Sequence, residues 1–203
     1  MNNPLLEELL YTVRDPTTTA PIFRFALERI GEHLGFEIAK DLVTQEQRIT
    51  TSLGQTATHS LLKEELTLVT VLRAGIPLYN GLLKAFPKAE SGFVGAMRNE
   101  ETLNATISYI ALPDIKNKII ILADTMIATG GSIVDTIKLL DMHAPKKIIV
   151  AGAFVAPEGV AKIKEYDKNI RVYAAQIDCL LNEKGYILPG LGDAGDRCYG
   201  RKV

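Results

Sequence analysis

The stretch IIILADTMIATGGS, residues 119–132, decides how this sequence folds. Its β-branched opening, from Ile119 to Ile121, shows no alternation of apolar and polar positions. Such a run is typical of a strand that is buried on both faces of a parallel sheet. The stretch therefore predicts a central strand over residues 119–123.

The segment ATGGS, residues 128–132, predicts a loop that binds one phosphate. Its side chains are small, so successive backbone N–H groups can close on an anion, and Thr129 and Ser132 add hydroxyl donors. Apolar residues then recur at helical spacing from Ile133 to Leu140, which predicts a helix over 132–142 whose N-terminus favours negative charge. Because the loop contains no lysine, it suits a monoester phosphate better than a polyphosphate.

Asp124 precedes this loop, at a position where its carboxylate could accept hydrogen bonds from sugar hydroxyls. A simpler interpretation is also open. Gly130 and Gly131 alone favour a tight turn after a core strand, without any ligand. Other segments of the sequence have to decide between the two.

A second glycine-rich stretch, YILPGLGDAGDRCYG, covers residues 186–200. Residues 190–195 match the dinucleotide fingerprint Gly-x-Gly-x-x-Gly, but only eight residues follow Gly195, too few for the helix and strand that the motif needs. The glycines can instead let main-chain N–H and C=O groups approach a flat ligand closely. A disordered tail is disfavoured, because tyrosine, isoleucine and leucine are poor tail residues.

Two arginines occupy positions that suit anion binding. Arg73 lies in VLRAG, residues 71–75, which follows an apolar run and indicates a strand end, the edge at which open α/β sheets bind ligands. Arg98 lies in AMRNEET, residues 96–102, a polar stretch between two apolar ones. Taken alone, Arg73 would be interpreted as a surface arginine beside a turn.

These four segments resemble the motifs of the type I phosphoribosyltransferases, and their residues are most similar to those of the uracil phosphoribosyltransferase family. They come in the family's order and at its spacings, and weaker similarity extends from about Arg14 to Lys202. The resemblance implies an enzyme that transfers the 5-phosphoribosyl group of phosphoribosyl pyrophosphate (PRPP) to uracil. The products would be UMP and pyrophosphate.

The resemblance also implies a set of site residues. For PRPP they are Arg73, Arg98, Asp124, Thr125, Met126, Ile127, Ala128, Thr129, Gly130, Gly131, Ser132 and Asp193. For uracil they are Ile187, Gly192, Asp193 and Ala194, and the candidate catalytic residues are Asp124, Arg73 and Asp193. No metal site made of protein ligands is implied, and Mg²⁺ is expected to bind mainly through PRPP.

Three positions depart from the pattern of the family. Thr125 stands where the uracil branch usually has proline, and Pro77 lies in a turn that is usually richer in glycine. The chain ends in Gly-Arg-Lys-Val, where the family commonly ends in Gly-Thr-Lys. These departures put the details of the ribose and pyrophosphate contacts in question, and they leave the uracil-binding turn untouched.

Two other functions are compatible with a PRPP loop. The first is a regulator that senses PRPP or UMP and controls pyrimidine genes through RNA. A net charge of −1 disfavours it, since a nucleic-acid footprint shows a basic excess. The second is a phosphoribosyltransferase for another base. The stretch 186–200 disfavours this function, because it resembles the uracil-binding segment.

The composition also indicates the cellular compartment and the partners that we expect for the protein. Cys179 and Cys198 form no CxxC pair, so we expect free thiols in a reducing compartment. No secretory signal or apolar run of membrane-spanning length is present, which predicts a cytoplasmic protein without a membrane or nucleic-acid partner. The resemblance implies a homodimer or higher homo-oligomer, with GTP as a candidate effector.

The fold expected from these patterns is α/β, like that of a type I phosphoribosyltransferase, in a single domain over 1–203. Apolar residues from Ile22 to Ile38 predict an amphipathic helix that begins near Thr19 and Pro21, inside an N-terminal helical segment of about 1–45. A mostly parallel sheet flanked by helices follows, with an irregular C-terminal hood over about 178–203. Strands are predicted near 66–72, 92–97, 106–112, 119–123, 147–155 and 170–177, and helices at 132–142 and 157–166.

Overall fold

The computed structural model describes residues 3–98 and 105–201, and its centre is a six-stranded sheet with the order β5-β4-β3-β6-β7-β8. All neighbouring strands are parallel except β5, which is antiparallel to β4. The expected mostly parallel sheet is confirmed. The strands are β3 (Leu66–Leu72), β4 (Glu90–Arg98), β5 (Ala105–Ala111), β6 (Ile119–Ile127), β7 (Lys147–Val155) and β8 (Arg171–Ile177).

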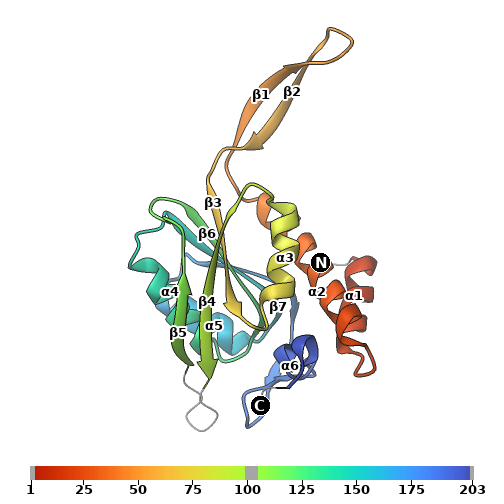
Figure 1. Ribbon diagram of the computed structural model, residues 1–203, viewed down its shortest axis with the longest axis vertical. Helices are drawn as coiled ribbons and strands as arrows, with labels where there is room; N and C mark the ends of the chain where they lie inside the picture. Colours follow the sequence, from red (N-terminus) through yellow and green to blue (C-terminus); the bar gives the residue numbers. More distant parts are fainter. Residues whose placement is uncertain (1–2, 99–104, 202–203) are drawn as a thin grey trace.

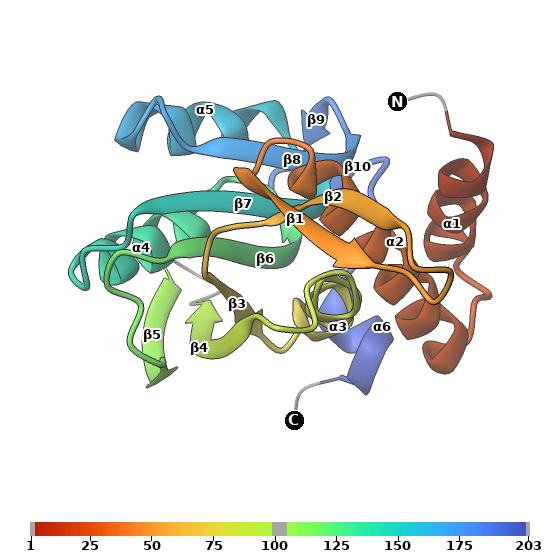
Figure 2. The same ribbon diagram turned by 90° about the horizontal axis from the view of Figure 1, so that it is seen from above.

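Helices cover both faces of this sheet (Figures 1 and 2). Because side chains alternate along a strand, Leu68 and Ile121 pack into one core and Val69 and Ile120 into the other. The first core also receives α1 (Pro4–Arg14), α2 (Ala20–Ala39) and α3 (Ile76–Ala85). The second receives α4 (Gly131–Asp141) and α5 (Pro157–Tyr166).

Helix α2 begins after Thr19, with proline in its first turn, as predicted. Of the apolar residues that were expected to face the core, Ile22 is 53% exposed. The others are buried, namely Phe23, Ala26, Leu27, Ile30, Leu34 and Ile38. Helix α3 packs very close to α2 at Gly81. A side chain there would stand 1.8 Å from the carbonyl oxygen of Glu28, so the close contact requires glycine. The sequence analysis did not predict α3.

A long β-hairpin projects from the body of the molecule (Figure 1) and was also missed. Its strands, β1 (Thr44–Thr50) and β2 (Thr56–Leu62), are antiparallel and exposed along nearly their whole length. Strand prediction depends on one face being apolar, and the polar sequence TQEQRIT of β1 offers no such face.

Two boundaries differ from the prediction in ways that affect the site. Strand β6 continues to Ile127, because β7 pairs with it as far as Ile127 and Val155. The hood is not irregular: it contains a short hairpin of β9 (Leu180–Leu181) and β10 (Ile187–Leu188), followed by helix α6 (Ala194–Tyr199). Among the described residues, no helix has the length and apolar character needed to cross a membrane.

Candidate active site

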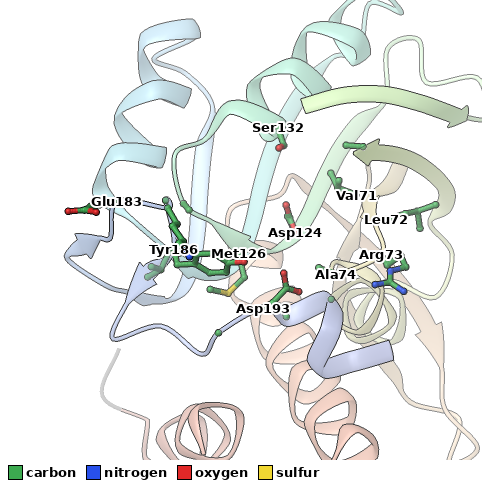
Figure 3. Close-up of a pocket in the computed structure, with 18 residues that line it drawn as sticks. Val71, Leu72, Arg73, Ala74, Asp124, Met126, Ser132, Glu183, Tyr186 and Asp193 are labelled. Carbon is green, nitrogen blue, oxygen red and sulfur yellow. The ribbon is translucent and has the colours of Figure 1, made fainter. Parts of the chain in front are cut away.

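A cavity of about 650 Å³ lies between the carboxyl ends of β3 and β6 and the hood (Figure 3). This is the edge of a parallel sheet at which ligands usually bind. Its walls come from four parts of the chain that are far apart in sequence. The lining residues are Val71, Leu72, Arg73, Ala74, Ala96, Asp124, Met126, Ala128, Ser132, Glu183, Lys184, Gly185, Tyr186, Ile187, Gly192, Asp193, Ala194 and Gly195.

Asp124 is the buried acid of the cavity. Its carboxyl group is 9% exposed, and burial raises its pKa to about 7, although backbone hydrogen bonds at Met126 and Thr125 oppose this shift. The group is therefore poised to change charge near neutral pH. Asp124 and Asp193 both point into the cavity, the first from the sheet and the second from the hood (Figure 3).

The alternation of strand β6 divides the predicted PRPP residues into two sets. Asp124 and Met126 line the cavity, whereas the alternate residues Thr125 and Ile127 are fully or almost fully buried and are not among the lining residues. The Thr125 hydroxyl donates a hydrogen bond of 2.7 Å to the carbonyl oxygen of Ala74. Thr125 thus ties β6 to the segment that carries Arg73, which gives this unusual residue a structural role.

Arg73 reaches from the end of β3 toward the hood. Its guanidinium donates to the carbonyl oxygen of Gly200 at 3.3 Å and lies 3.5 Å from the carboxylate of Asp196. Pro77 occupies the first turn of α3, where proline fits without the loss of a helical hydrogen bond. The second departure from the family pattern is therefore accommodated by the helix that the sequence analysis missed.

The ATGGS segment connects β6 to the N-terminus of α4. Gly130 is the N-cap residue with φ of +77°, and a side chain there would lie 2.9 Å from the carbonyl oxygen of Gly159. Ala128 and Ser132 line the cavity, and Thr129, Gly130 and Gly131 are not among its lining residues. The expected order of strand, loop and helix is confirmed, although the helix begins one residue earlier than predicted, at Gly131.

All four predicted uracil residues lie on the hood side of the cavity. Ile187 begins β10 and is buried, and Gly192 has a φ of +85°. Asp193 caps α6, since its side chain accepts a 2.8 Å hydrogen bond from the backbone N–H of Asp196. We call residues 192–194 the base turn. The structure brings it to the same cavity as Asp124, 68 positions earlier than Gly192 in the chain.

The sequence analysis missed one wall, formed by residues 183–186. These residues form the turn between β9 and β10, in which the side chain of Asn182 accepts hydrogen bonds from the backbone of Lys184 and Tyr186 at 3.0 and 2.9 Å. The spacing of Asn182 and Gly185 is a recognisable turn signal that could have located it. The side chain of Arg98 and the rest of its segment, 99–102, lie outside the described residues.

Within the described part of the chain, no group of three or more His, Cys, Asp or Glu side chains could hold a metal ion. Both cysteines are free thiols: Cys179 is exposed, and burial raises the pKa of Cys198 to about 11. Cys198 therefore stays protonated at neutral pH and is a poor nucleophile.

The architecture is similar to that of solved phosphoribosyltransferases. A solved hypoxanthine-guanine phosphoribosyltransferase from Bacillus anthracis has the same fold, with a TM-score of 0.53 over 77% of this chain and 79% of that one. At 17% identity, this likeness concerns the fold alone. A structure from Aquifex aeolicus is far more similar, with a TM-score of 0.93, 38% identity and coverage of 100% and 98%.

The chain belongs to the uracil phosphoribosyltransferase family, whose model matches residues 1–201. A uracil phosphoribosyltransferase from Clostridioides difficile is 41% identical over 99% of this chain and 97% of the relative. Another, from Aquifex aeolicus, is 38% identical over 100% and 98%. The family and fold class predicted from the sequence are confirmed, and the comparisons favour neither alternative function.

Proposed function

We propose that this chain carries out the reaction of its family, PRPP plus uracil giving UMP and pyrophosphate, in the cavity between β6 and the hood. One observation carries the proposal for the site. A single cavity is lined by the buried acid Asp124 and by Ala128 and Ser132 of the ATGGS segment on one side, and by the base turn on the other. An enzyme that joins a phosphorylated sugar to a base needs both kinds of surface within one cavity.

PRPP would bind along the sheet side of the cavity. The ATGGS segment would hold the 5-phosphate at the N-terminus of α4, where unpaired backbone N–H groups favour an anion. Asp124 would accept hydrogen bonds from the ribose hydroxyls, and Arg73 and Arg98 would contact the pyrophosphate. The positive charge of the arginines would offset the negative charge that develops on the departing pyrophosphate.

Uracil would bind on the hood side. Main-chain groups of Ile187 and of the base turn can meet its carbonyl oxygens and ring N–H in a fixed order. Cytosine carries an exocyclic amine in place of one carbonyl, so a buried donor would face another donor. Such a mismatch discriminates strongly between bases.

The chemistry needs orientation and charge rather than a covalent intermediate. A ring nitrogen of uracil displaces pyrophosphate from the anomeric carbon of PRPP, and the cavity holds the two reactants in line. Asp124 and Asp193 offer carboxylate oxygens, the ligand type that Mg²⁺ prefers, so either fits an ion held mainly by PRPP. When bound, Mg²⁺ would neutralise charge on the departing pyrophosphate.

The proposal is tested by the formation of UMP from PRPP and Mg²⁺ with uracil, beside parallel reactions with cytosine, orotate, hypoxanthine and xanthine. Turnover of uracil alone supports both the reaction and the assignment of the base turn. Turnover of another base, or none, refutes the proposal. A second series with GTP tests the effector role, which an unchanged rate would exclude.

The β1–β2 hairpin supports a homodimer or higher homo-oligomer. Its strands expose Ile49, Leu61 and Leu62 at 60%, 45% and 41%, and a two-stranded hairpin of this kind is marginally stable in water. A second copy of the chain would bury these residues. Sedimentation equilibrium of the unaltered chain and of Ile49→Glu tests this, and a monomer in both cases contradicts it.

The free cysteines support the cytoplasmic location expected from the sequence.

A further inference from the structure

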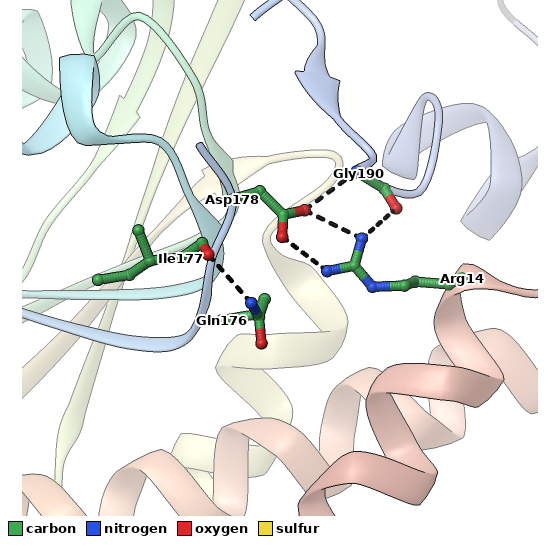
Figure 4. Close-up of polar contacts among 5 residues, drawn as sticks. All are labelled: Arg14, Gln176, Ile177, Asp178 and Gly190. Carbon is green, nitrogen blue, oxygen red and sulfur yellow. Dashed lines mark hydrogen bonds and ion pairs between the residues drawn. The ribbon is translucent and has the colours of Figure 1, made fainter. Parts of the chain in front are cut away.

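An ion pair between the partly exposed Arg14 and the buried Asp178 joins the first helix to the hood, outside the cavity (Figure 4). Asp178 directly follows β8 and is 3% exposed. Arg14, at the end of α1, donates to both of its carboxylate oxygens, at 2.7 and 3.0 Å. The guanidinium also lies 4.6 Å from the centre of the Phe154 ring. This bidentate geometry fixes the orientation of both partners.

The same pair holds both backbone polar groups of Gly190. The N–H of Gly190 donates to Asp178 at 3.0 Å, and its carbonyl oxygen accepts from Arg14 at 2.9 Å (Figure 4). Gly190 has a φ of +55°, and a side chain there would lie 2.0 Å from the carbonyl oxygen of Ile187. The position of Gly190 is therefore coupled to that of Ile187, which it contacts closely. It is also coupled to the base turn, which begins two residues later at Gly192.

A second arginine, Arg197 of α6, reinforces this connection from the other direction. It donates to the carbonyl oxygen of Leu191 at 2.9 Å and to that of Asp15 at 2.6 Å, and also to that of Val13. The end of α1 is thus joined to the chain immediately before the base turn. No residue of α1 lines the cavity itself, on the sheet side or on the hood side.

We propose that Arg14 is a positioning residue for the base: through Asp178 and Gly190 it fixes Ile187 and the base turn in the arrangement that selects uracil. The inference rests on the proposed function of the cavity. It predicts that loosening this pair weakens the use of uracil and the rejection of cytosine more than it weakens PRPP binding, to which the base turn contributes only Asp193.

The central variant is Arg14→Lys. Lysine keeps a positive charge beside Asp178, so the buried carboxylate retains a partner, but its single nitrogen cannot span both carboxylate oxygens and the Gly190 carbonyl. Removal of the arginine charge alone would leave the buried Asp178 carboxylate with the Gly190 N–H but without a positive charge beside it, which destabilises a fold strongly. The double variant Arg14→Met with Asp178→Asn removes both charges and serves as the second test.

The matched control is Arg24→Met. Arg24 also donates from an N-terminal helix to a hood carbonyl, that of Cys198, but this contact lies beyond the base turn. The measurements are the KM values for uracil and PRPP, the ratio of kcat/KM for uracil and cytosine, calorimetric PRPP binding and thermal unfolding. For Arg14→Lys and for the double variant we expect roughly a tenfold rise in the KM for uracil, with PRPP affinity within about twofold.

A purely structural role would instead lower the unfolding temperature and change both KM values together. An unchanged KM for uracil, a parallel loss of PRPP binding, or the same uracil-specific loss in Arg24→Met would each overturn the inference. If the unaltered chain forms no UMP from uracil, the proposed function itself fails, and the inference falls with it.

Discussion

The guanidinium of Arg73 lies 3.5 Å from the carboxylate of Asp196, so a residue from the sheet side of the cavity is paired with one from the hood helix. Both side chains are about one-third exposed. The pyrophosphate that Arg73 is proposed to bind would compete with Asp196 for the same guanidinium. The ion pair between Arg73 and Asp196 therefore connects the hood to the proposed pyrophosphate site.

Replacement of Asp196 by asparagine is expected to strengthen PRPP binding, because it removes the competing negative charge. Exposed ion pairs contribute at most about 1 kcal/mol, so the KM for PRPP should fall by roughly twofold to fivefold. Steady-state kinetics at low and high salt measure the effect. The control is Glu37→Gln, which removes a carboxylate from a surface pair on α2. A rise in the KM for PRPP would show that Asp196 orients Arg73 instead of competing for it.

Arg73→Ala is expected to weaken PRPP use by roughly tenfold or more, since a charge-assisted hydrogen bond contributes about 1.5–3 kcal/mol. Arg73→Lys should retain part of the affinity because it keeps the charge. The KM for PRPP and the kcat of each variant are the relevant measurements. Kinetics identical to those of the unaltered chain would remove Arg73 from the pyrophosphate site.

Gly130 and Gly131 should respond differently to substitution. Gly130→Ala puts a side chain on a left-handed residue 2.9 Å from a backbone oxygen, so the fold should lose about 1–3 kcal/mol. A side chain at Gly131 would meet its nearest atom, Nζ of Lys162, at 3.6 Å, an ordinary contact. Gly131→Val should thus unfold near the normal temperature and lose PRPP binding. Thermal unfolding and calorimetry separate the two effects, and normal PRPP binding by Gly131→Val would contradict the phosphate assignment.

Asp124→Asn should stabilise the fold above neutral pH and weaken PRPP binding. In the unfolded chain the carboxyl group loses its proton near pH 3.8, whereas in the folded chain it keeps it to about pH 7. Stability contributed by this group is therefore present below pH 3.8 and is lost as the pH rises through 7. The amide carries no charge to bury, so the gain at pH 8 should be on the order of 4 kcal/mol.

Denaturant unfolding of both proteins at pH 5 and pH 8 measures this difference, which should be larger at pH 8. An equal difference at the two pH values would mean that Asp124 ionises at an ordinary pKa. The same variant should bind PRPP roughly tenfold more weakly, because an amide replaces an acceptor of sugar hydroxyls.

The central sheet could be predicted because burial on both faces leaves continuous apolar runs, as in residues 119–123. The same logic failed for the β1–β2 hairpin, whose strands bury neither face and so carry no apolar pattern. Helix α3 was missed because the segment after Arg73 was interpreted only as a turn. Pro77, which was considered a departure, is in fact typical of a helix start.

For the site, the motifs located segments that line the cavity, but they did not give the orientation of each residue. The predicted strand ends at residue 123, and the family resemblance implies PRPP contacts for residues 125 and 127. Hydrogen bonding to β7 extends the strand and turns these two side chains away from the cavity. Arg14 and Asp178, 164 positions apart, meet only through the tertiary fold, and no local pattern could have paired them.

The hairpin also offers a practical attachment point. Its two ends meet at the body, where the N–H of Lys63 donates to the carbonyl oxygen of Val43 at 3.0 Å. At the far end, Leu53 is 86% exposed, and a side chain at Gly54 would meet nothing within 4 Å. Exposed loop tips of this kind tolerate inserted sequence. A fluorescent label or short peptide placed between Leu53 and Gly54 would therefore report on the molecule from a distance, without crowding the cavity.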